Sequence, residues 1–318
     1  MFRCMDSTPY DCIVVGGGAA GLSAALVLGR ARRRTLLIDA GRQSNRPAHG
    51  IGGLLGHDGR PPAELYALGR EELATYPSVT VRDGEVTAGE HDGEGFTLTL
   101  ADGTVERARR VILATGMDYR FPELPGAAER WGGTVFHCPF CHGWEVREQP
   151  LAVLDDGASG LHRAQLLRMW SDDVTLLTNG PTTLTADERA QLDRAGVEID
   201  EREVAGLTGD APALEAVTFA DGSTRPCGGL LVPITLHQRS DLADRLGATA
   251  ADATPLAPAP VAIDAMGQTA AEGVVAAGDV TAEMPAVANA IAAGSRAAAK
   301  VVQSLMVEVT APRAPSRA

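Results

Sequence analysis

The feature that most constrains this chain is a glycine-rich turn between an apolar segment and a helical segment near its start. Residues 12–15 are apolar and mostly β-branched, which predicts a buried strand of a parallel sheet. Glycines dominate residues 16–21, and residues 22–30 have helical composition. A second apolar run at 35–38 ends on Asp39. This succession of strand, turn, helix and strand predicts an α/β domain.

The glycine spacing in this turn matches the fingerprint G-x-G-x-x-G. Gly16 allows the turn, Gly18 lets the backbone approach a pyrophosphate, and Gly21 lets the helix meet the strand. Asp39, about 20 residues further on, can accept hydrogen bonds from ribose hydroxyls. A glycine turn alone often reflects tight packing, but its position between strand and helix predicts a dinucleotide site here. The residues expected to line it are Gly16, Gly18, Ala19, Ala20, Gly21 and Asp39.

Length and charge narrow the possible functions. A chain of 318 residues corresponds to about two domains. With 28 Lys and Arg against 41 Asp and Glu, the net charge of −13 argues against a nucleic-acid partner. The sequence contains no apolar run of about 18 residues, so it predicts no membrane-spanning helix. The first ten residues lack the apolar core of a signal peptide, so we expect a cytoplasmic protein.

The five cysteines are too few and too unevenly spaced for a disulfide framework. Cys138 and Cys141 form a C-x-x-C pair, which in a cytoplasmic protein indicates redox or metal chemistry. A structural zinc ion would need two more ligands, and only His137 and His142 flank the pair. Adjacent residues rarely bind the same metal ion, so we expect no metal site.

Two later segments repeat the pattern of a buried strand that ends on small residues. One covers 111–116 and the other 274–280, which precedes an alanine-rich helix expected over about 285–306. The C-x-x-C pair follows the first of these strands by about 20 residues. Together these motifs resemble low-molecular-weight thioredoxin reductases, which are FAD-dependent pyridine nucleotide-disulphide oxidoreductases. The resemblance covers residues 10–305.

This resemblance implies an α/β fold of two Rossmann-like, three-layer domains and a homodimer. Residues 1–118 and 243–318 would form a discontinuous FAD domain, and 119–242 an inserted NAD(P)H-binding-like domain that carries the C-x-x-C pair. Asp279 would bind the ribityl chain, while Asn289 and Ala290 would approach the pyrimidine edge of the flavin. Cys141 would face the flavin and Cys138 the substrate. The further residues implied in the FAD site are Ala114, Thr115, Gly116 and Gly278.

The central domain departs from the reductase pattern. Its turn at 155–160 keeps Gly157 and Gly160, but Asp155 replaces the first glycine, and Asp156 adds a second carboxylate that would oppose a pyrophosphate. No basic cluster follows the strand at 174–177, so NAD(P)H binding is doubtful, although a variant NADH site stays open. Residues 138–145 resemble the stretch C-x-[FY]-C-H-G-[WY]-E of the dithiol oxidases of gliotoxin and holomycin.

The predicted activity is thiol–disulfide exchange, in which a thiolate is the nucleophile. His137 and His142 could each accept a proton or stabilise a thiolate. We expect an FAD-dependent oxidase that converts a small-molecule dithiol into a disulfide, with oxygen as acceptor. The open alternatives are an NAD(P)H-dependent thioredoxin or disulfide reductase, a reductase fed by another donor such as ferredoxin, and a flavin-bound redox sensor. The corresponding partners are a small-molecule dithiol or disulfide, or a thioredoxin-like protein.

Overall fold

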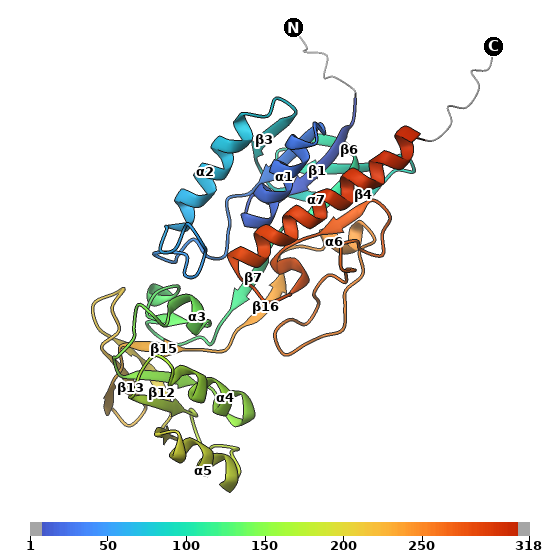
Figure 1. Ribbon diagram of the computed structural model, residues 1–318. Helices are drawn as coiled ribbons and strands as arrows, with labels where there is room; N and C mark the ends of the chain where they lie inside the picture. Colours follow the sequence, from blue (N-terminus) through green and yellow to red (C-terminus); the bar gives the residue numbers. More distant parts are fainter. Residues whose placement is uncertain (1–7, 311–318) are drawn as a thin grey trace, which may run out of the picture. The chain divides into compact units, whose positions relative to one another are not determined.

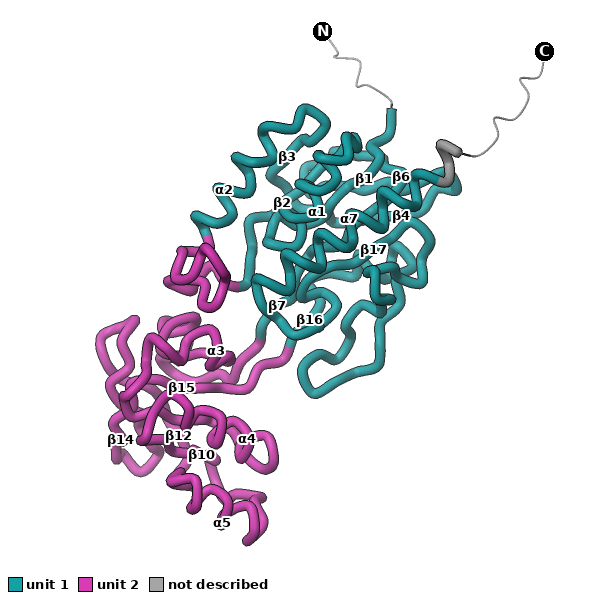
Figure 2. The backbone as a smooth tube through the Cα atoms, viewed as in Figure 1, with its two compact units in different colours: residues 1–44, 63–119, 236–318 teal, residues 45–62, 120–235 magenta. Residues whose placement is uncertain are grey.

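The computed structural model of the protein describes residues 8–310 (Figure 1). Within this part, the chain divides into two compact units, which Figure 2 distinguishes by colour. Unit 1 comprises residues 8–44, 63–119 and 236–310. Unit 2 comprises Asn45–Pro62 and Arg120–Thr235. Each unit has a parallel sheet and a hydrophobic core of its own.

Unit 1 is built on a sheet in the order β3-β2-β1-β6-β5-β4, with β17 also paired to β6. The strands β1, β2, β3, β6 and β17 are parallel, and β4 and β5 are antiparallel. Val15 lies opposite both Ile38 and Leu113, and Leu113 lies opposite Ala276, so four carboxyl ends meet at one edge. The strands are β1 (Tyr10–Val15), β2 (Thr35–Asp39), β3 (Val79–Asp83), β4 (Val86–His91), β5 (Phe96–Leu100), β6 (Val105–Leu113) and β17 (Val274–Ala276).

The two faces of this sheet are covered by different elements because successive side chains of β1 point to opposite sides. Cys12 and Val14 pack with residues of α1 and α7, which lie against each other (Figure 1). Ile13 and Val15 pack with residues of β4, β5 and α6. The helices of unit 1 are α1 (Ala19–Arg30), α2 (Pro62–Ala74), α6 (Leu242–Arg245) and α7 (Val287–Thr310), with a 3-10 turn η2 (Asp279–Thr281).

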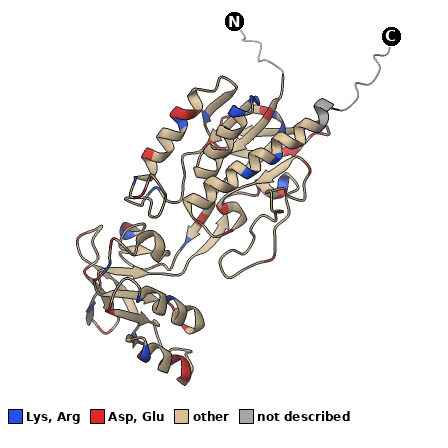
Figure 3. Ribbon diagram, in the orientation of Figure 1, with Lys and Arg blue, Asp and Glu red and all other residues tan. Residues whose placement is uncertain are grey.

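Unit 2 contains a parallel sheet in the order β11-β10-β9-β15-β8 and an antiparallel sheet β12-β13-β14. The strands are β8 (Val135–Phe136), β9 (Leu151–Leu154), β10 (Val174–Leu177), β11 (Val197–Asp200), β12 (Val204–Thr208), β13 (Ala216–Phe219), β14 (Thr224–Pro226) and β15 (Gly229–Leu231). The helices are η1 (Ala128–Arg130), α3 (Pro139–His142), α4 (Gly157–Leu167) and α5 (Ala186–Arg194). On α5, acidic residues occupy the first turn and Arg194 the last (Figure 3), which suits the helix dipole.

The chain passes from one unit to the other within a pair of short strands. β7 (Met117–Arg120) pairs with β16 (Thr235–Gln238), and the boundaries of the units fall in these strands. The segment Asn45–Pro62 also changes unit, because its contacts place it in unit 2. It contains no helix before α2 and only the isolated bridge between Ile51 and Arg60.

The predicted α/β class with two Rossmann-like domains is confirmed. The last helix begins at Val287 and extends to Thr310, beyond the expected end near residue 306. The observed units differ from the expected boundaries chiefly in the placement of Asn45–Pro62. Among residues 8–310, no helix combines the length and the apolar character that crossing a bilayer demands.

Candidate functional site

The glycine turn after β1 is closed on two sides by backbone. Gly16 has φ of +111°, and a Cβ there would lie 2.1 Å from the carbonyl oxygen of Ala114. A Cβ on Gly21 would lie 1.8 Å from the carbonyl oxygen of Gly16. Only glycine fits at both positions, because neither backbone neighbour can move aside. The turn therefore brings the start of α1 directly against the end of β6.

Gly18 differs from these two glycines because it faces open space. It is the N-cap of α1, which begins at Ala19, and a Cβ on it would meet only Cγ of Gln43, at 3.6 Å. The first backbone N–H groups of a helix are free to bind an anion. The turn therefore presents free backbone N–H donors next to Gly18, which has no side chain to block the approach of an anion.

Asp39 at the end of β2 is buried and holds this turn together. Its Oδ1 accepts hydrogen bonds from the N–H of Gly17 at 3.2 Å and of Gly41 at 2.9 Å. Its Oδ2 lies 2.5 Å from a guanidinium nitrogen of Arg70 on α2. Gln43 donates to the same carboxylate. The sequence indicated Asp39 as a ribose acceptor but gave no sign of Arg70 or Gln43, whose approach depends on tertiary packing.

The residues after β6 and β17 lie beside the same turn. The Cα of Thr115 is 3.2 Å from the Cβ position of Gly16, and Gly116 follows with φ of +63°. Gly278 has φ of +81°, and a Cβ on it would lie 3.0 Å from Cβ of Ala20 and 3.8 Å from Cβ of Ala290. These predicted residues of unit 1 are therefore brought together at the carboxyl edge of the sheet.

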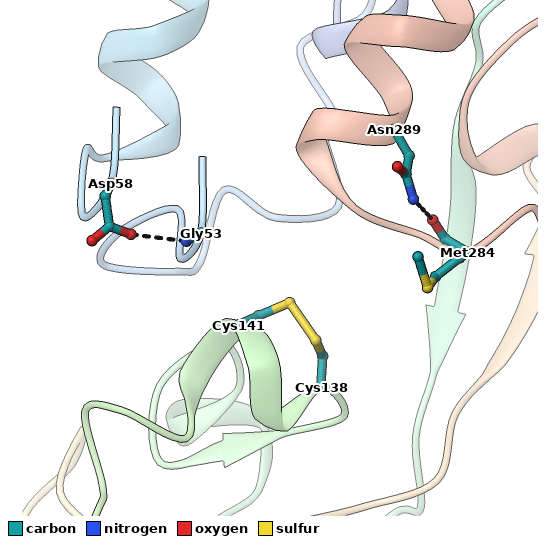
Figure 4. Close-up of a disulfide and its surroundings, with 6 residues drawn as sticks. All are labelled: Gly53, Asp58, Cys138, Cys141, Met284 and Asn289. Atoms are coloured by element: carbon teal, nitrogen blue, oxygen red, sulfur yellow. Dashed lines mark hydrogen bonds between the residues drawn. A yellow bond between two sulfur atoms is a disulfide. The ribbon is translucent and has the colours of Figure 1, made fainter. Parts of the chain in front are cut away.

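Asp279 accepts a hydrogen bond of 2.8 Å from the hydroxyl of Tyr119, a residue that the sequence did not indicate. Burial raises the pKa of Asp279, and this hydrogen bond and the charge of Arg239 oppose the rise. Asn289 instead is exposed, and its Nδ2 donates to the carbonyl oxygen of Met284 at 2.9 Å (Figure 4). Its expected contact with a flavin ring stays a prediction.

In unit 2, Cys138 and Cys141 form a disulfide with Cα atoms 5.3 Å apart (Figure 4). Cys138 is the N-cap of α3, and Pro139 occupies the first helical position, where a missing N–H costs nothing. The N–H groups of Cys141 and His142 donate to the carbonyl oxygen of Cys138 at 3.1 and 3.2 Å. A Cβ on Gly52 would lie 2.6 Å from the carbonyl oxygen of Cys141, so the segment Asn45–Pro62 passes directly over this helix.

Both histidines beside the disulfide favour the neutral form. Burial lowers the pKa of His142, and the charge of Glu145 and the backbone of Cys138 and Gly132 oppose this shift. Burial, with the charges of His142 and Arg163, lowers the pKa of His137 to about 4. His137 stacks on Trp131 with ring centroids 5.7 Å apart, and Trp131 stacks on Phe121 at 4.2 Å. Each imidazole is therefore neutral at neutral pH, and burial makes it a weaker base than an exposed histidine.

Acidification is expected to destabilise unit 2 through His137. Its pKa falls from an ordinary 6.5 to about 4, so between these values the unfolded chain binds the extra proton. Stability therefore falls as the pH drops through this window and loses nothing further from His137 below it. Urea unfolding of the protein and of His137→Gln at several pH values measures the difference. An identical pH dependence in both proteins would contradict this assignment.

The turn at the start of α4 is closed by its own side chains. Asp155 accepts hydrogen bonds from the hydroxyl of Ser159 at 2.8 Å and from Arg163 at 2.6 Å. Asp156 accepts hydrogen bonds from the hydroxyl of Thr182 and from the N–H and hydroxyl of Thr183, the last two at 2.9 and 2.8 Å. Despite the opposing effect of burial, these bonds lower the pKa of Asp156 to about 2.

The two glycines of this second turn lie against other parts of unit 2. Gly157 has φ of +58°, and a Cβ on it would lie 3.2 Å from the hydroxyl of Thr183. Gly160 lies against the backbone of Asp155, as Gly21 lies against Gly16 in unit 1. After β10, the hydroxyl of Thr178 donates to the carbonyl oxygen of Gly180, and no basic side chain occurs in residues 178–183. The fold of a dinucleotide turn is present, but a protein loop occupies its open side.

The remaining cysteines of the described chain are isolated from this chemistry. Cys12 and Cys227 are buried free thiols, and burial raises the pKa of Cys227 to about 12. Cys4 lies outside the described residues. Within residues 8–310, no cluster of three His, Cys, Asp or Glu side chains could hold a metal ion.

Comparison with known proteins identifies the family. The model of the pyridine nucleotide-disulphide oxidoreductases matches residues 10–294. The chain belongs to this family. Thioredoxin reductase aclD of Aspergillus oryzae is 32% identical over 95% of this chain and 98% of its own length. A probable thioredoxin reductase of Arthroderma benhamiae is 31% identical over 75% of this chain, and the match spans 66% of that protein.

Among solved structures, that of HlmI is 36% identical and superposes with a TM-score of 0.89, covering 96% of each chain. The resemblance to thioredoxin reductases is thereby confirmed, and the protein is an oxidoreductase. FAD is the cofactor of this pyridine nucleotide-disulphide oxidoreductase, as predicted.

The first glycine turn fits the FAD that this family carries. Gly16 and Gly21 seal the turn, while Gly18 leaves the N-terminus of α1 open to a pyrophosphate. Gly278 and Ala290 extend the same small-residue surface along α7. The individual contacts of these residues with FAD stay predictions.

Proposed function

We propose that this pyridine nucleotide-disulphide oxidoreductase oxidises a small-molecule dithiol to a disulfide and passes the electrons through FAD to oxygen. The observation that carries the proposal is the closed turn of unit 2. A reductase takes its electrons from a nicotinamide nucleotide, whose pyrophosphate needs an open glycine turn. Here the ionised Asp156 and the bound Thr183 stand where that pyrophosphate would approach Gly157.

The contrast between the two turns of this chain supports the same direction. The Cβ position of Gly18 in unit 1 has only a flexible glutamine methylene within 4 Å. The corresponding Gly157 in unit 2 is in contact with a threonine that is itself held by a carboxylate. A phosphate group would have to displace this hydrogen-bonded loop and overcome the repulsion of Asp156. Electrons are therefore more readily supplied by the substrate that meets the disulfide.

The disulfide and His142 supply the chemistry for a dithiol. A substrate thiol gives its proton to a neutral imidazole, and the resulting thiolate attacks Sγ of Cys138. The bond between Cys138 and Cys141 breaks, and Cys141 leaves as a thiolate. The second substrate thiol then displaces Cys138 from the mixed disulfide. The balance is one dithiol and one protein disulfide giving one cyclic disulfide and two protein thiols. His142 is the proposed proton acceptor because it follows Cys141 directly in α3.

Re-formation of the Cys138–Cys141 disulfide needs a two-electron acceptor, which FAD supplies when bound. Oxygen as the final acceptor would yield hydrogen peroxide, one molecule for each dithiol. We further propose that the partner is a small molecule rather than a thioredoxin-like protein, and that the protein acts as a cytoplasmic homodimer. The small-molecule partner and the homodimer follow from the family resemblance that the sequence motifs imply.

NADPH and NADH are expected to leave the flavin oxidised under anaerobic conditions, whereas a dithiol bleaches it. The reason is the closed turn between Asp156, Gly157 and Thr183. The flavin absorbance is recorded while each reductant is added, and calorimetric titration with NADPH provides a second readout of binding. Dithiothreitol is the positive control.

Rapid bleaching by micromolar NADPH would contradict the proposal and return the protein to the reductases. If dithiols bleach the flavin but oxygen does not reoxidise it, the assignment of oxygen as the electron acceptor is wrong. Another electron acceptor would then have to take the two electrons of the reduced flavin.

A further inference from the structure

Large apolar side chains of unit 2 are exposed to solvent, and two of them lie within or just after the C-x-x-C motif. Phe140, which lies within the C-x-x-C motif, is 72% exposed, and Trp144 is 66% exposed. Met169 is 74% exposed. Exposed apolar residues that cluster near a reactive group indicate a binding surface, whereas single exposed residues do not. These side chains form a binding surface only where they lie next to one another.

Trp170 lies against Phe140 and is the chain neighbour of Met169. Its ring meets that of Phe140 edge-to-face, with centroids 5.4 Å apart and an interplanar angle of 83°. A Cβ on Gly143 would lie 2.9 Å from the same indole, so Trp170 packs against α3 immediately before Trp144. Met169 precedes Trp170 in the chain, and both line one hollow. We call Phe140, Trp144, Met169 and Trp170 the aromatic ridge.

Trp144 is held in place by Arg147. A guanidinium nitrogen of Arg147 donates to the carbonyl oxygen of Trp144 at 2.6 Å, and its carbon lies 3.9 Å from the centre of the indole. This cation–π contact covers one face of the ring. Trp144 is still 66% exposed to solvent. Trp144 is thus a fixed platform on which a flat group could stack.

The charges around the aromatic ridge disfavour anions. Arg147 and Arg168 keep their positive charges, and Arg168 forms an ion pair with Asp172 at 3.2 Å. Glu145, Glu148, Asp172 and Asp173 supply four negative charges, so the carboxylates outnumber the two guanidinium groups. The carboxylates of Glu145 and Glu148 make no hydrogen bond or ion pair among the described residues. The hollow beside the ridge has a volume of about 410 Å³ and is lined by Glu148, Arg168, Met169, Trp170, Ser171, Asp172 and Asp173. A carboxylate-bearing ligand would be repelled there.

We propose that the aromatic ridge selects the substrate, and that it favours small dithiols carrying a flat apolar ring and no carboxylate. This inference rests on the proposed dithiol oxidation. The reaction is the exchange given above: the substrate loses two electrons and two protons and closes its disulfide, and Cys138 and Cys141 become thiols. An extended acidic protein surface does not match a ridge of this charge.

The effect of the ring is tested with two dithiols that close disulfide rings of equal size. One is ortho-benzenedimethanethiol and the other is dithiothreitol, which has no ring. We expect Phe140→Ser and Trp144→Ser to raise KM for the aromatic dithiol about tenfold, as loss of a stacking contact implies. In both variants the KM for the aromatic dithiol should rise by a larger factor than the KM for dithiothreitol. Trp144→Phe should restore most of the affinity.

The effect of charge is tested with dihydrolipoamide and dihydrolipoate, which differ only in an amide and a carboxylate. We expect a higher KM for dihydrolipoate, and a smaller difference between the two in Glu148→Gln, because this variant removes one nearby carboxylate. An equal KM for the two ligands, or an unchanged difference in the variant, would overturn the charge argument.

Val105→Ser is the matched control, since Val105 is 47% exposed on β6 in unit 1. Alkylation of Cys138 and Cys141 followed by mass spectrometry measures reduction of the disulfide directly. If no dithiol reduces it, the proposed function fails. If dithiothreitol reduces it but Phe140→Ser and Trp144→Ser change both substrates equally, or neither, the aromatic ridge does not select substrate. Preferential loss of activity on a thioredoxin-like protein would identify the ridge as a protein-docking surface and overturn the proposal.

Discussion

Replacing Cys138 by serine is expected to lower dithiol oxidation at least about a thousandfold while leaving FAD bound, because a serine oxygen cannot form the mixed disulfide. Cys141 would then be a free thiol. If it faces the flavin, as the family resemblance implies, its thiolate donates charge into the ring system. A long-wavelength absorbance shoulder should therefore appear in Cys138→Ser. The absorbance spectrum and a turnover assay measure both effects.

Cys141→Ser is expected to be equally inactive but to lack the shoulder. The matched control is Cys227→Ser, because Cys227 is a buried thiol of the same unit whose burial raises its pKa to about 12. This variant should keep its turnover. A shoulder in Cys141→Ser and none in Cys138→Ser would reverse the roles of the two sulfurs. Full activity in both would remove the pair from the mechanism.

Gly18→Leu is expected to yield a folded protein that does not retain FAD. The Cβ position of Gly18 is free, with Gln43 Cγ at 3.6 Å, so the fold tolerates a side chain there. That side chain would occupy the space through which the backbone approaches the pyrophosphate. Flavin content after purification measures the loss, and circular dichroism measures the fold.

The comparison variant is Gly21→Leu, in which a Cβ would lie 1.8 Å from the carbonyl oxygen of Gly16. This substitution should destabilise unit 1 itself, so that FAD is lost together with structure. A Gly18→Leu protein that keeps FAD in equimolar amount would show that the pyrophosphate does not approach this turn.

The strands could be predicted because a parallel sheet buries both of its faces. The apolar runs at 151–154 and 174–177 correspond to β9 and β10, since so short a buried run between turns is typical of a strand. The glycine fingerprint likewise predicted Gly16 and Gly21 in a closed turn, because that spacing has a backbone cause. Local physical requirements of this kind are visible in the order of residues.

Contacts between distant residues could not be predicted in this way. The hydrogen bond from Tyr119 to Asp279 joins residues 160 apart, and that from Arg70 to Asp39 joins residues 31 apart. For Asp156, the sequence indicated only repulsion of a phosphate. The structure adds that this carboxylate binds Thr182 and Thr183, which follow the next strand of the sheet. Such pairings depend on how the loops fold over the sheet edge.

The segment Asn45–Pro62 illustrates the same difficulty, since its neighbours in the sequence, β2 and α2, belong to unit 1. Its contacts with α3 follow from Gly52, which lies against the carbonyl oxygen of Cys141. Nothing in its composition distinguishes a loop that covers its own domain from one that covers another.

This loop has a consequence for any attempt to isolate the half of the molecule that carries the disulfide. A fragment cut at the ends of Arg120–Thr235 would contain the whole parallel sheet of unit 2 and the cysteine pair. It would lack Gly52, however, and so would leave the backbone of Cys141 uncovered. Unit 2 therefore cannot be transplanted as one continuous stretch of chain. A chimaeric protein that contains α3 and the disulfide would need to include the loop Asn45–Pro62 as a second, separate segment.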